Sequence, residues 1–329
     1  MVPDGVDGEE LSRAAEAVTL CRDLINTPSN DLGPAELEDA VRKLAAQHGA
    51  AINVINGEAL EKGFPLIHAV GMGSKRSPRL IDLTWGKESA PKITLVGKGV
   101  CFDTGGLDIK PASGMLNMKK DMGGAATALA LAHMIMAGGL KVRLRVLVPA
   151  VENSISGISF RPRDVYVSRK GLSVEIGNTD AEGRLILADA LALADEEKPA
   201  LIADFATLTG AARVAMGPEL APFFTDDDAL AGDLMAAGTR EYDPLWRMPL
   251  WRPYDSMLDS KVADFNNVGS GPHGGAITAA LFLRRFVEAK SWLHLDIFAW
   301  TASAKPGRPE GGELQSARAI YAMLKERYR

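Results

Sequence analysis

The feature that most constrains the fold of this chain is an alternation of short apolar runs with longer segments of helical periodicity. Buried strands are expected at residues 93–96, 144–148, 201–205 and 293–297. The helical segments are 8–25, 34–48, 123–138, 182–196, 226–239, 275–288 and 315–327. Strands that alternate with helices usually pair in parallel and are covered on both faces. The pattern therefore predicts an α/β fold, a three-layer sandwich with a mostly parallel central sheet and helices on both faces.

Composition narrows the class of protein. With 329 residues, 47% hydrophobic and 24% charged, the chain can bury a large core. No apolar run approaches the roughly 20 residues of a membrane span. A net charge of -5 argues against a nucleic-acid surface. We therefore expect neither a membrane nor nucleic acid as a partner.

The first residues and the cysteines indicate a cytoplasmic location. Residues 1–10 are acidic and lack the charged-then-apolar layout of a signal peptide. Cys21 and Cys101 do not form a disulfide framework, which fits a reducing compartment. Although Cys101 lies close to the motifs described next, its expected role is packing in a buried strand.

The run 178–184, Asn-Thr-Asp-Ala-Glu-Gly-Arg, is the most informative motif. If it is extended, Asp180, Glu182 and Arg184 point to one side. Two carboxylates and a guanidinium on one side favour a bound cation with an anion beside it. Alternatively, one of residues 178–180 caps a helix that begins near Ala181, with Glu182 in its first turn. Taken alone, the run leaves both interpretations open.

Two upstream segments favour the metal site. The first is 96–111, Val-Gly-Lys-Gly-Val-Cys-Phe-Asp-Thr-Gly-Gly-Leu-Asp-Ile-Lys-Pro, and the second is 118–124, Met-Lys-Lys-Asp-Met-Gly-Gly. With 178–184, these segments resemble the signatures of the leucyl aminopeptidase (cytosol aminopeptidase) family in order and separation. The resemblance runs from about Glu9 to the C-terminus. It implies a hydrolase that removes the N-terminal, leucine-like residue from peptides.

The resemblance assigns the metal ligands. Asp103, Asp121, Asp180 and Glu182 supply carboxylates, and oxygen-rich sites suit Mn or Mg, while Zn also accepts carboxylates. Four carboxylates in one cleft favour two divalent ions. By resemblance, Asp103 and Glu182 bridge the two metals, Asp180 completes one site, and Asp121 with Lys98 completes the other.

Lys98 is an unusual ligand, because an ammonium coordinates only after it loses its proton, which neighbouring cations promote. The alternative is a surface or phosphate-binding lysine between Gly97 and Gly99. However, the chain contains neither the P-loop motif nor G-x-G-x-x-G. The family resemblance therefore favours the ligand interpretation.

Two further residues are expected to act in catalysis. By resemblance, Lys110 stays protonated and stabilises the oxyanion that forms on the scissile carbonyl. Arg184 resembles the residue that holds a bicarbonate ion, which takes a proton from the attacking water. Without the motif, Lys110 would be an ordinary loop lysine, and Arg184 would pair with Asp180 or Glu182.

Substrate contacts are expected around the first side-chain pocket. Residues that resemble family positions there are Met118, Thr207, Leu208 and Gly210. Ordinary core packing remains the alternative for Met118 and Leu208. Lys98 follows strand 93–96, and residues 207–210 follow strand 201–205. Open α/β sheets bind ligands at the carboxyl ends of their strands, so the motifs and the predicted topology agree.

The chain also departs from the family. Residues 1–30 are expected to form a linker helix and residues 31–329 the di-metal catalytic domain, without the usual N-terminal domain. The resemblance implies a homo-oligomer, a hexamer in the family, but without that domain the sequence leaves the number of subunits open. Phe298 and Trp300 replace small residues and are expected to narrow or redirect the specificity pocket. The loop 266–275 is expected to shape substrate access, and Trp246, Trp251 and Trp292 to anchor the core or an interface.

Two other functions compete with a broad aminopeptidase. One is a narrow dipeptidase of the same family, for example one that cleaves cysteinylglycine. The other is a DNA-binding or scaffold relative, which the complete ligand set and the absence of a basic stripe disfavour. The histidines lack metal-ligand spacing, and neither H-E-x-x-H nor G-x-S-x-G occurs.

Overall fold

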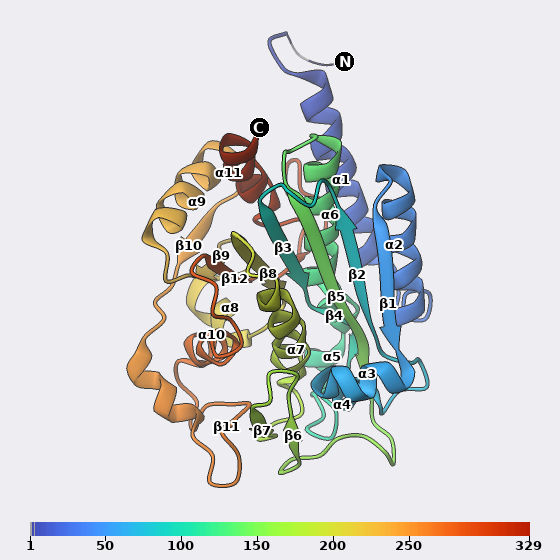
Figure 1. Ribbon diagram of the computed structural model, residues 1–329, viewed down its shortest axis with the longest axis vertical. Coiled ribbons are helices and arrows are strands. Elements are labelled where there is room, and N and C mark those ends of the chain that lie inside the picture. Colours follow the sequence, from blue (N-terminus) through green and yellow to red (C-terminus); the bar gives the residue numbers. More distant parts are fainter. Residues whose placement is uncertain (1, 3) are drawn as a thin grey trace.

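The computed structural model describes residues 2 and 4–329 (Figure 1). Its largest sheet has the strand order β1-β2-β5-β3-β8-β12-β9-β10, with β4 paired to β5 beside this path. The strands are β1 (Ala51–Asn56), β2 (Arg79–Trp85), β3 (Lys92–Gly97), β4 (Gly99–Asp103), β5 (Arg143–Asn153), β8 (Leu201–Ala206), β9 (Ala221–Phe224), β10 (Leu245–Arg247) and β12 (Trp292–Asp296).

The centre of this sheet is parallel and its flanks are mixed. Strands β5, β3, β8 and β12 pair in parallel. Strands β1, β2 and β9 join by antiparallel pairings. All four predicted strands lie in the parallel centre, which confirms the predicted fold class.

Helices cover both faces of the sheet (Figure 1). One face packs against α1 (Gly8–Asn26), α2 (Pro34–His48), α6 (Gly123–Ala137), α9 (Asp228–Arg240) and α11 (Ala317–Tyr328). The other packs against α3 (Gly57–Gly63), α4 (Pro65–Gly71), α7 (Glu182–Glu196) and α10 (Gly275–Arg284). The predicted helices are confirmed to within a few residues. The largest difference is at α10, which ends at Arg284 rather than at 288.

Smaller elements connect these layers. They are α5 (Ala112–Met115), η1 (Met118–Met122), β6 (Val165–Val167), β7 (Ser173–Glu175), α8 (Gly210–Met216), η2 (Arg252–Leu258), β11 (Phe265–Asn266), β13 (Trp300–Thr301) and β14 (Gly311–Gly312). Both described ends of the chain lie at the same end of the molecule (Figure 1).

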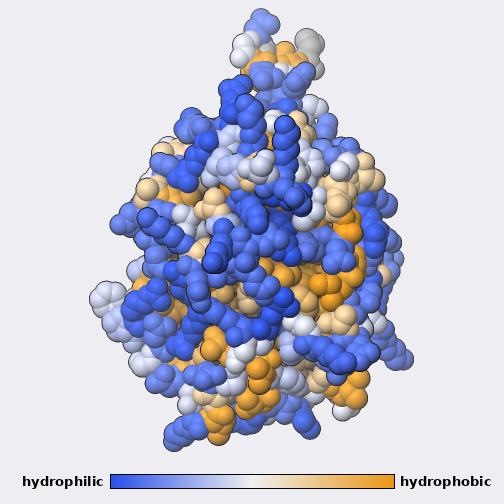
Figure 2. All heavy atoms as spheres, viewed as in Figure 1, coloured by the Kyte–Doolittle hydropathy of each residue, from blue (hydrophilic) through white to orange (hydrophobic). Residues whose placement is uncertain are grey.

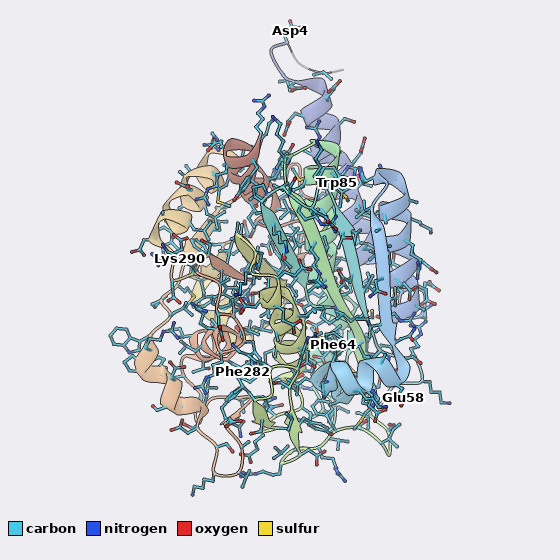
Figure 3. The ribbon with its side chains drawn as sticks, viewed as in Figure 1. Asp4, Glu58, Phe64, Trp85, Phe282 and Lys290 are labelled. Carbon is cyan, nitrogen blue, oxygen red and sulfur yellow. The ribbon has the colours of Figure 1, made fainter. Side chains whose placement is uncertain are left out.

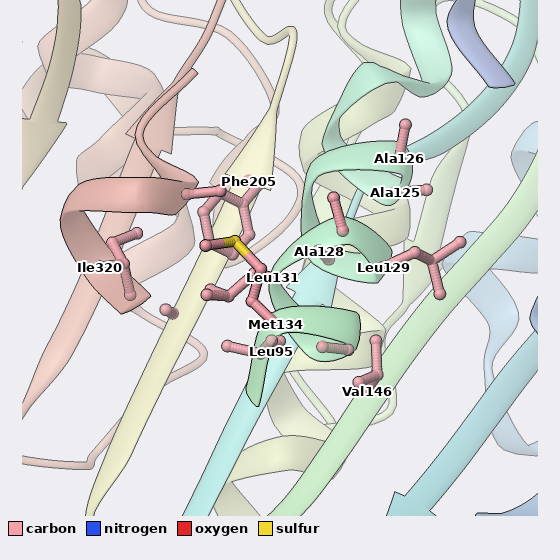
Figure 4. Packing of buried hydrophobic residues seen from close by; sticks show 14 of the residues in the cluster. Leu95, Ala125, Ala126, Ala128, Leu129, Leu131, Met134, Val146, Phe205 and Ile320 are labelled. Carbon is pink, nitrogen blue, oxygen red and sulfur yellow. The ribbon is translucent and has the colours of Figure 1, made fainter. Parts of the chain in front are cut away.

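Side chains of successive strand residues serve opposite cores. On β3, Leu95 belongs to the core under α6, whereas Val96 belongs to the core under α7. Figure 4 shows Leu95, Val146 and Phe205 of three strands packed against α6, with Ile320 of α11 on the side of Phe205. Helix α6 is apolar on all sides and buried almost throughout, as expected for a helix enclosed between a sheet and other helices.

Polar side chains cover most of the surface in view, and some of the large aromatic residues are buried. The face in Figure 2 is mostly hydrophilic, with scattered apolar side chains. Figure 3 contrasts Phe282, buried within α10, with Glu58 on the exposed side of α3. Trp292 is a core residue as predicted, but Trp246 and Trp251 are 53% and 54% exposed, so a core role is wrong for these two.

Cys101 packs in the buried strand β4, as predicted. Within residues 2 and 4–329, no helix combines the length and the apolar character that crossing a membrane requires.

Candidate metal centre

The candidate site lies where the parallel strands end. Lys98 follows β3, Thr207 follows β8 and Ile297 follows β12. Their carboxyl ends meet at one edge of the sheet, where a cleft of about 450 Å³ opens. The structure brings every predicted site residue to this cleft: Lys98, Asp103, Lys110, Met118, Asp121, Asp180, Glu182, Arg184, Thr207, Leu208 and Gly210.

Three carboxylates form the floor of the cleft. Oxygen atoms of Asp103, Asp121 and Glu182 lie within 4.8 Å of one another, and all three residues are buried. The Asp180 side chain is more accessible, with 33% of its area exposed, and forms an ion pair with Lys110. A buried group of carboxylates this close is unfavourable without a compensating positive charge.

Local backbone structure fixes Asp103. This residue ends β4, and its Oδ1 accepts hydrogen bonds from the Gly105 amide and the Asn153 side-chain amide, both at 2.8 Å. Gly105 and Gly106 have φ of 88° and 67°, a backbone conformation that favours glycine. The turn after β4 thereby holds the Asp103 carboxylate in one orientation.

Lys98 lies between two of the carboxylates. Its Nζ is 2.9 Å from Asp121 Oδ2 and 2.8 Å from Glu182 Oε1, and it donates to the Thr207 carbonyl at 3.0 Å. A Cβ on Gly183 would lie 2.6 Å from Lys98 Cε, so glycine at this position allows the lysine to pass α7. The Lys98 ammonium thus supplies positive charge inside the cluster.

Burial and crowding shift the acid–base behaviour of these groups. Burial, followed by repulsion from Asp103, raises the pKa of Asp180 to about 6 and raises that of Glu182 well above its usual range. Burial alone lowers the pKa of Lys98, but the charges of Asp121 and Glu182 outweigh this effect and raise it. The carboxylates of the cluster therefore favour additional positive charge.

The donor set of the cleft fits divalent cations. Asp121 Oδ2, Asp180 Oδ1 and Glu182 Oε1 are buried and accept no hydrogen bond from any residue in the described part of the chain. Their polar contacts are the ion pairs with Lys98 and Lys110. Buried carboxylate oxygens with unused lone pairs are suitable ligands for Mn, Mg or Zn.

Comparison with known proteins agrees with this chemistry. Residues 19–321 match the sequence profile of the cytosol aminopeptidase family, catalytic domain. The chain belongs to the cytosol aminopeptidase family. It is 46% identical over 295 residues to a probable cytosol aminopeptidase of Sinorhizobium medicae, covering 88% of this chain and 59% of that protein. A Roseiflexus castenholzii relative is 44% identical over 318 residues, covering 95% and 65%.

Solved structures of the family have the same fold. The cytosol aminopeptidase from Coxiella burnetii matches with a TM-score of 0.96 and 54% identity, over 98% of this chain and 70% of that one. The bottromycin maturation enzyme BotP in complex with Mn matches with a TM-score of 0.92 and 39% identity, over 96% and 71%. The chain spans about three fifths (59%) of the length of the first curated relatives it matches.

The segment that carries Asp180 and Glu182 differs from the extended conformation considered for it. Helix α7 begins at Glu182, so Glu182 and Arg184 are helical. The alternative is confirmed in that the helix begins near Ala181 with Glu182 in its first turn. It is wrong about the cap, because Ala181 is the N-cap residue and no side chain caps the helix. Asp180, Glu182 and Arg184 line the same cleft because the chain turns into the helix between them.

Arg184 is buried beside the carboxylates. Its Nη1 donates to the Asn267 carbonyl at 2.6 Å, and its Nε has no partner among residues 2 and 4–329. No ion pair with Asp180 or Glu182 is present in the described structure, so the pairing alternative is not observed. Burial lowers the pKa of Arg184 to about 10, and the group remains a cation at neutral pH.

Several residues that organise the site carried no signal in the sequence. Asp296 ends β12 and accepts hydrogen bonds from the Leu208 and Thr209 amides at 3.1 and 3.2 Å. Asn153 orients Asp103, and Asn267 holds Arg184. All three lie far along the chain from the groups they orient, so a local motif does not reveal them.

The expected bulky residues have different positions. Phe298 lines the cleft, together with Val268 from the loop that was expected to shape access. Trp300 is absent from the residues that line the cleft and instead borders a separate small cavity beside Pro218. Of the two aromatic residues, Phe298 is therefore the one that can alter the pocket.

Proposed function

We propose that this protein is a metallo-aminopeptidase that hydrolyses the N-terminal residue from peptides with two divalent ions. The observation that carries this proposal is the buried group of Asp103, Asp121 and Glu182, whose oxygens lie within 4.8 Å of one another. Membership of the cytosol aminopeptidase family supports the reaction class.

The family resemblance supplies the ligand assignment, and the cleft contains the donors that it requires. Asp103 and Glu182 would bridge the two ions, Asp180 would complete one site, and Asp121 with Lys98 would complete the other. BotP, a structural relative, is described in complex with Mn, which supports Mn alongside Zn and Mg. When bound, two such ions supply Lewis acidity that lowers the pKa of a water molecule and polarises a peptide carbonyl.

Lys110 would stabilise the negative charge that develops on the scissile carbonyl oxygen. Its Nζ is 2.8 Å from Asp103 Oδ2 and also pairs with Asp180. These carboxylates raise the pKa of Lys110 against the opposing effect of burial, so the side chain carries its proton. A fixed ammonium in a partly buried cleft is an effective oxyanion partner.

Arg184 would hold a bicarbonate ion that accepts the proton of the attacking water. The guanidinium is planar and suits a flat anion through two parallel hydrogen bonds. Arg184 lines the cleft and its buried Nε has no partner among the described residues, which supports an anion site at this position.

The substrate would lie along the loop after β8. Met118, Thr207, Leu208 and Gly210 would contact the first side chain and the peptide backbone. Two of these side chains are apolar, which supports a leucine-like first residue. A neutral α-amine would bind at the metal centre, so no dedicated acidic clamp is required.

The test is hydrolysis of Leu-p-nitroanilide by the purified protein with Mn²⁺ or Zn²⁺, and with a chelator added. We expect metal-dependent release that the chelator abolishes. Leu-amide and Leu-Gly assayed beside it separate a broad aminopeptidase from a dipeptidase. No release from any substrate with any metal would contradict the proposal.

A further inference from the structure

Two cations share one aromatic ring in the wall of the cleft. Lys120 Nζ lies 4.5 Å from the centre of the Phe298 ring, and Arg213 Cζ lies 5.8 Å from the same centre. Lys120 comes from η1 and Arg213 from α8, and both line the cleft with the carboxylates. Phe298 thus brings together two positive groups from distant segments.

These cations have unused hydrogen-bond donors. Lys120 is only 7% exposed, yet its side-chain amine forms no hydrogen bond or ion pair with any described residue. Arg213 forms an ion pair with Asp296 through Nη2, whereas its Nε and Nη1 are buried and have no partner among the described residues. Burying an uncompensated charge is unfavourable, and contact with an aromatic face offsets only part of this cost.

Charge balance in the cleft also favours an anion. The carboxylates on the floor are already paired with Lys98 and Lys110. The cations lining the cleft are Lys98, Lys110, Lys120, Arg184 and Arg213, against the carboxylates Asp103, Asp121, Asp180 and Glu182. Divalent ions on the floor would add further positive charge, and the only described carboxylate paired with the wall around Phe298 is Asp296, which forms an ion pair with Arg213.

We propose that the pocket accepts an acidic first residue, glutamate or aspartate, in addition to leucine-like residues. Lys120 and Arg213 bind the side-chain carboxylate of that residue, so the pocket prefers this carboxylate over its neutral isostere. This inference rests on the proposed aminopeptidase function. Met118 and Phe298 contact the methylene part of such a side chain, and the two cations contact its end. The carboxylate satisfies donors that no residue of the described structure satisfies.

The decisive experiment compares substrates that differ only in charge. Glu-p-nitroanilide and Gln-p-nitroanilide have nearly the same shape. The ratio of their kcat/KM values therefore measures how strongly the side chains around Phe298 prefer a carboxylate over a neutral amide. We expect the Mn²⁺-loaded protein to favour Glu by about tenfold or more. A ratio of one or less, with Gln or Leu substrate hydrolysed, would overturn this inference and leave the proposed function intact.

Two matched variants test whether Lys120 is responsible for the preference for Glu over Gln. Lys120→Met should reduce the Glu-to-Gln ratio about tenfold, with metal content measured in parallel. Lys119→Met is the control, because the Lys119 amine donates to the Asn26 carbonyl and does not line the cleft. An unchanged ratio in Lys120→Met, or an equal loss in Lys119→Met, would contradict the assignment.

A free C-terminal carboxylate is a second source of the same chemistry. Gln-Gly and Gln-Gly-amide differ only in that group, and we expect the cleft to hydrolyse them with similar kcat/KM. A strong preference for Gln-Gly without a preference for Glu-p-nitroanilide would overturn the inference in favour of a dipeptide carboxylate site. Hydrolysis of no substrate at all would overturn both this inference and the proposed function.

Discussion

Two clusters of buried charged residues in this molecule differ in how completely their carboxylates are paired. Arg145 on β5 donates from Nε and Nη2 to both carboxylate oxygens of Asp82 on β2, at 3.0 and 2.7 Å. In the cleft, by contrast, Asp121 Oδ2 and Glu182 Oε1 accept no hydrogen bond from any described residue, and burial, with repulsion from Asp103, raises the pKa of both carboxyl groups.

The difference separates a structural charge pair from a binding site. The buried Asp82 carboxylate has a complete bidentate partner in Arg145, which also pairs with the exposed Glu197, so Asp82 requires no ligand. In the cleft, four carboxylates share only two paired lysines, Lys98 and Lys110, and three of the carboxylate oxygens keep unused lone pairs, so the group favours cations. Incomplete pairing of buried groups is therefore a better marker of function than burial itself.

The largest effect is expected for Glu182→Gln. This change removes a proposed bridging ligand, so kcat/KM should fall at least about a thousandfold and bound metal should decrease. Because one crowded carboxylate is removed, the Tm measured in chelator should be unchanged or higher. Glu196→Gln, at the exposed end of the same helix, is the matched control. Normal metal content and rate in Glu182→Gln would contradict the site assignment.

The opposite behaviour is expected for Arg145→Met. The change leaves the Asp82 carboxylate buried without its partner and should reduce the free energy of unfolding by about 3–5 kcal/mol. Turnover per folded molecule should stay the same. Urea denaturation measures the free energy of unfolding. The rate of the metal-loaded protein, divided by the concentration of active sites, measures turnover per folded molecule. Arg143→Met, two residues earlier on β5, should cost far less. If both variants lost equal stability, the pair would not have its proposed structural role.

Lys110→Met should separate catalysis from metal binding. We expect bound metal to be retained and kcat to fall about a hundredfold, because the oxyanion loses its charged partner. Metal analysis and steady-state kinetics on the same sample test this. An unchanged kcat would remove Lys110 from the mechanism.

The smallest effect is expected for Arg184→Met. Loss of the proposed bicarbonate should lower kcat about tenfold, which is less than a general base usually contributes. The wild-type protein should respond to added bicarbonate at constant pH, and the variant should not. An equal response in both proteins would place the bicarbonate elsewhere or exclude it.

Much of the fold follows from local sequence. The strand at 201–205 and the helix at 182–196 were predictable because apolar periodicity and strand length act over a few neighbouring residues. The error at 178–184 has the same origin, since spacing alone does not distinguish an extended segment from a turn into a helix. In that run, the identity of the residues was more informative than their conformation.

The sequence by itself determined the fold class and indicated the residues of the proposed metal centre, from Lys98 to Arg184, because these lie in three short segments. Only the tertiary structure decided their surroundings. Asn153, Asp296 and Asn267 act on groups dozens of residues away, and Lys120 and Arg213 meet only at Phe298. The physical reason is that parallel strands bring their carboxyl ends together at one edge of the sheet, so distant segments become neighbours there.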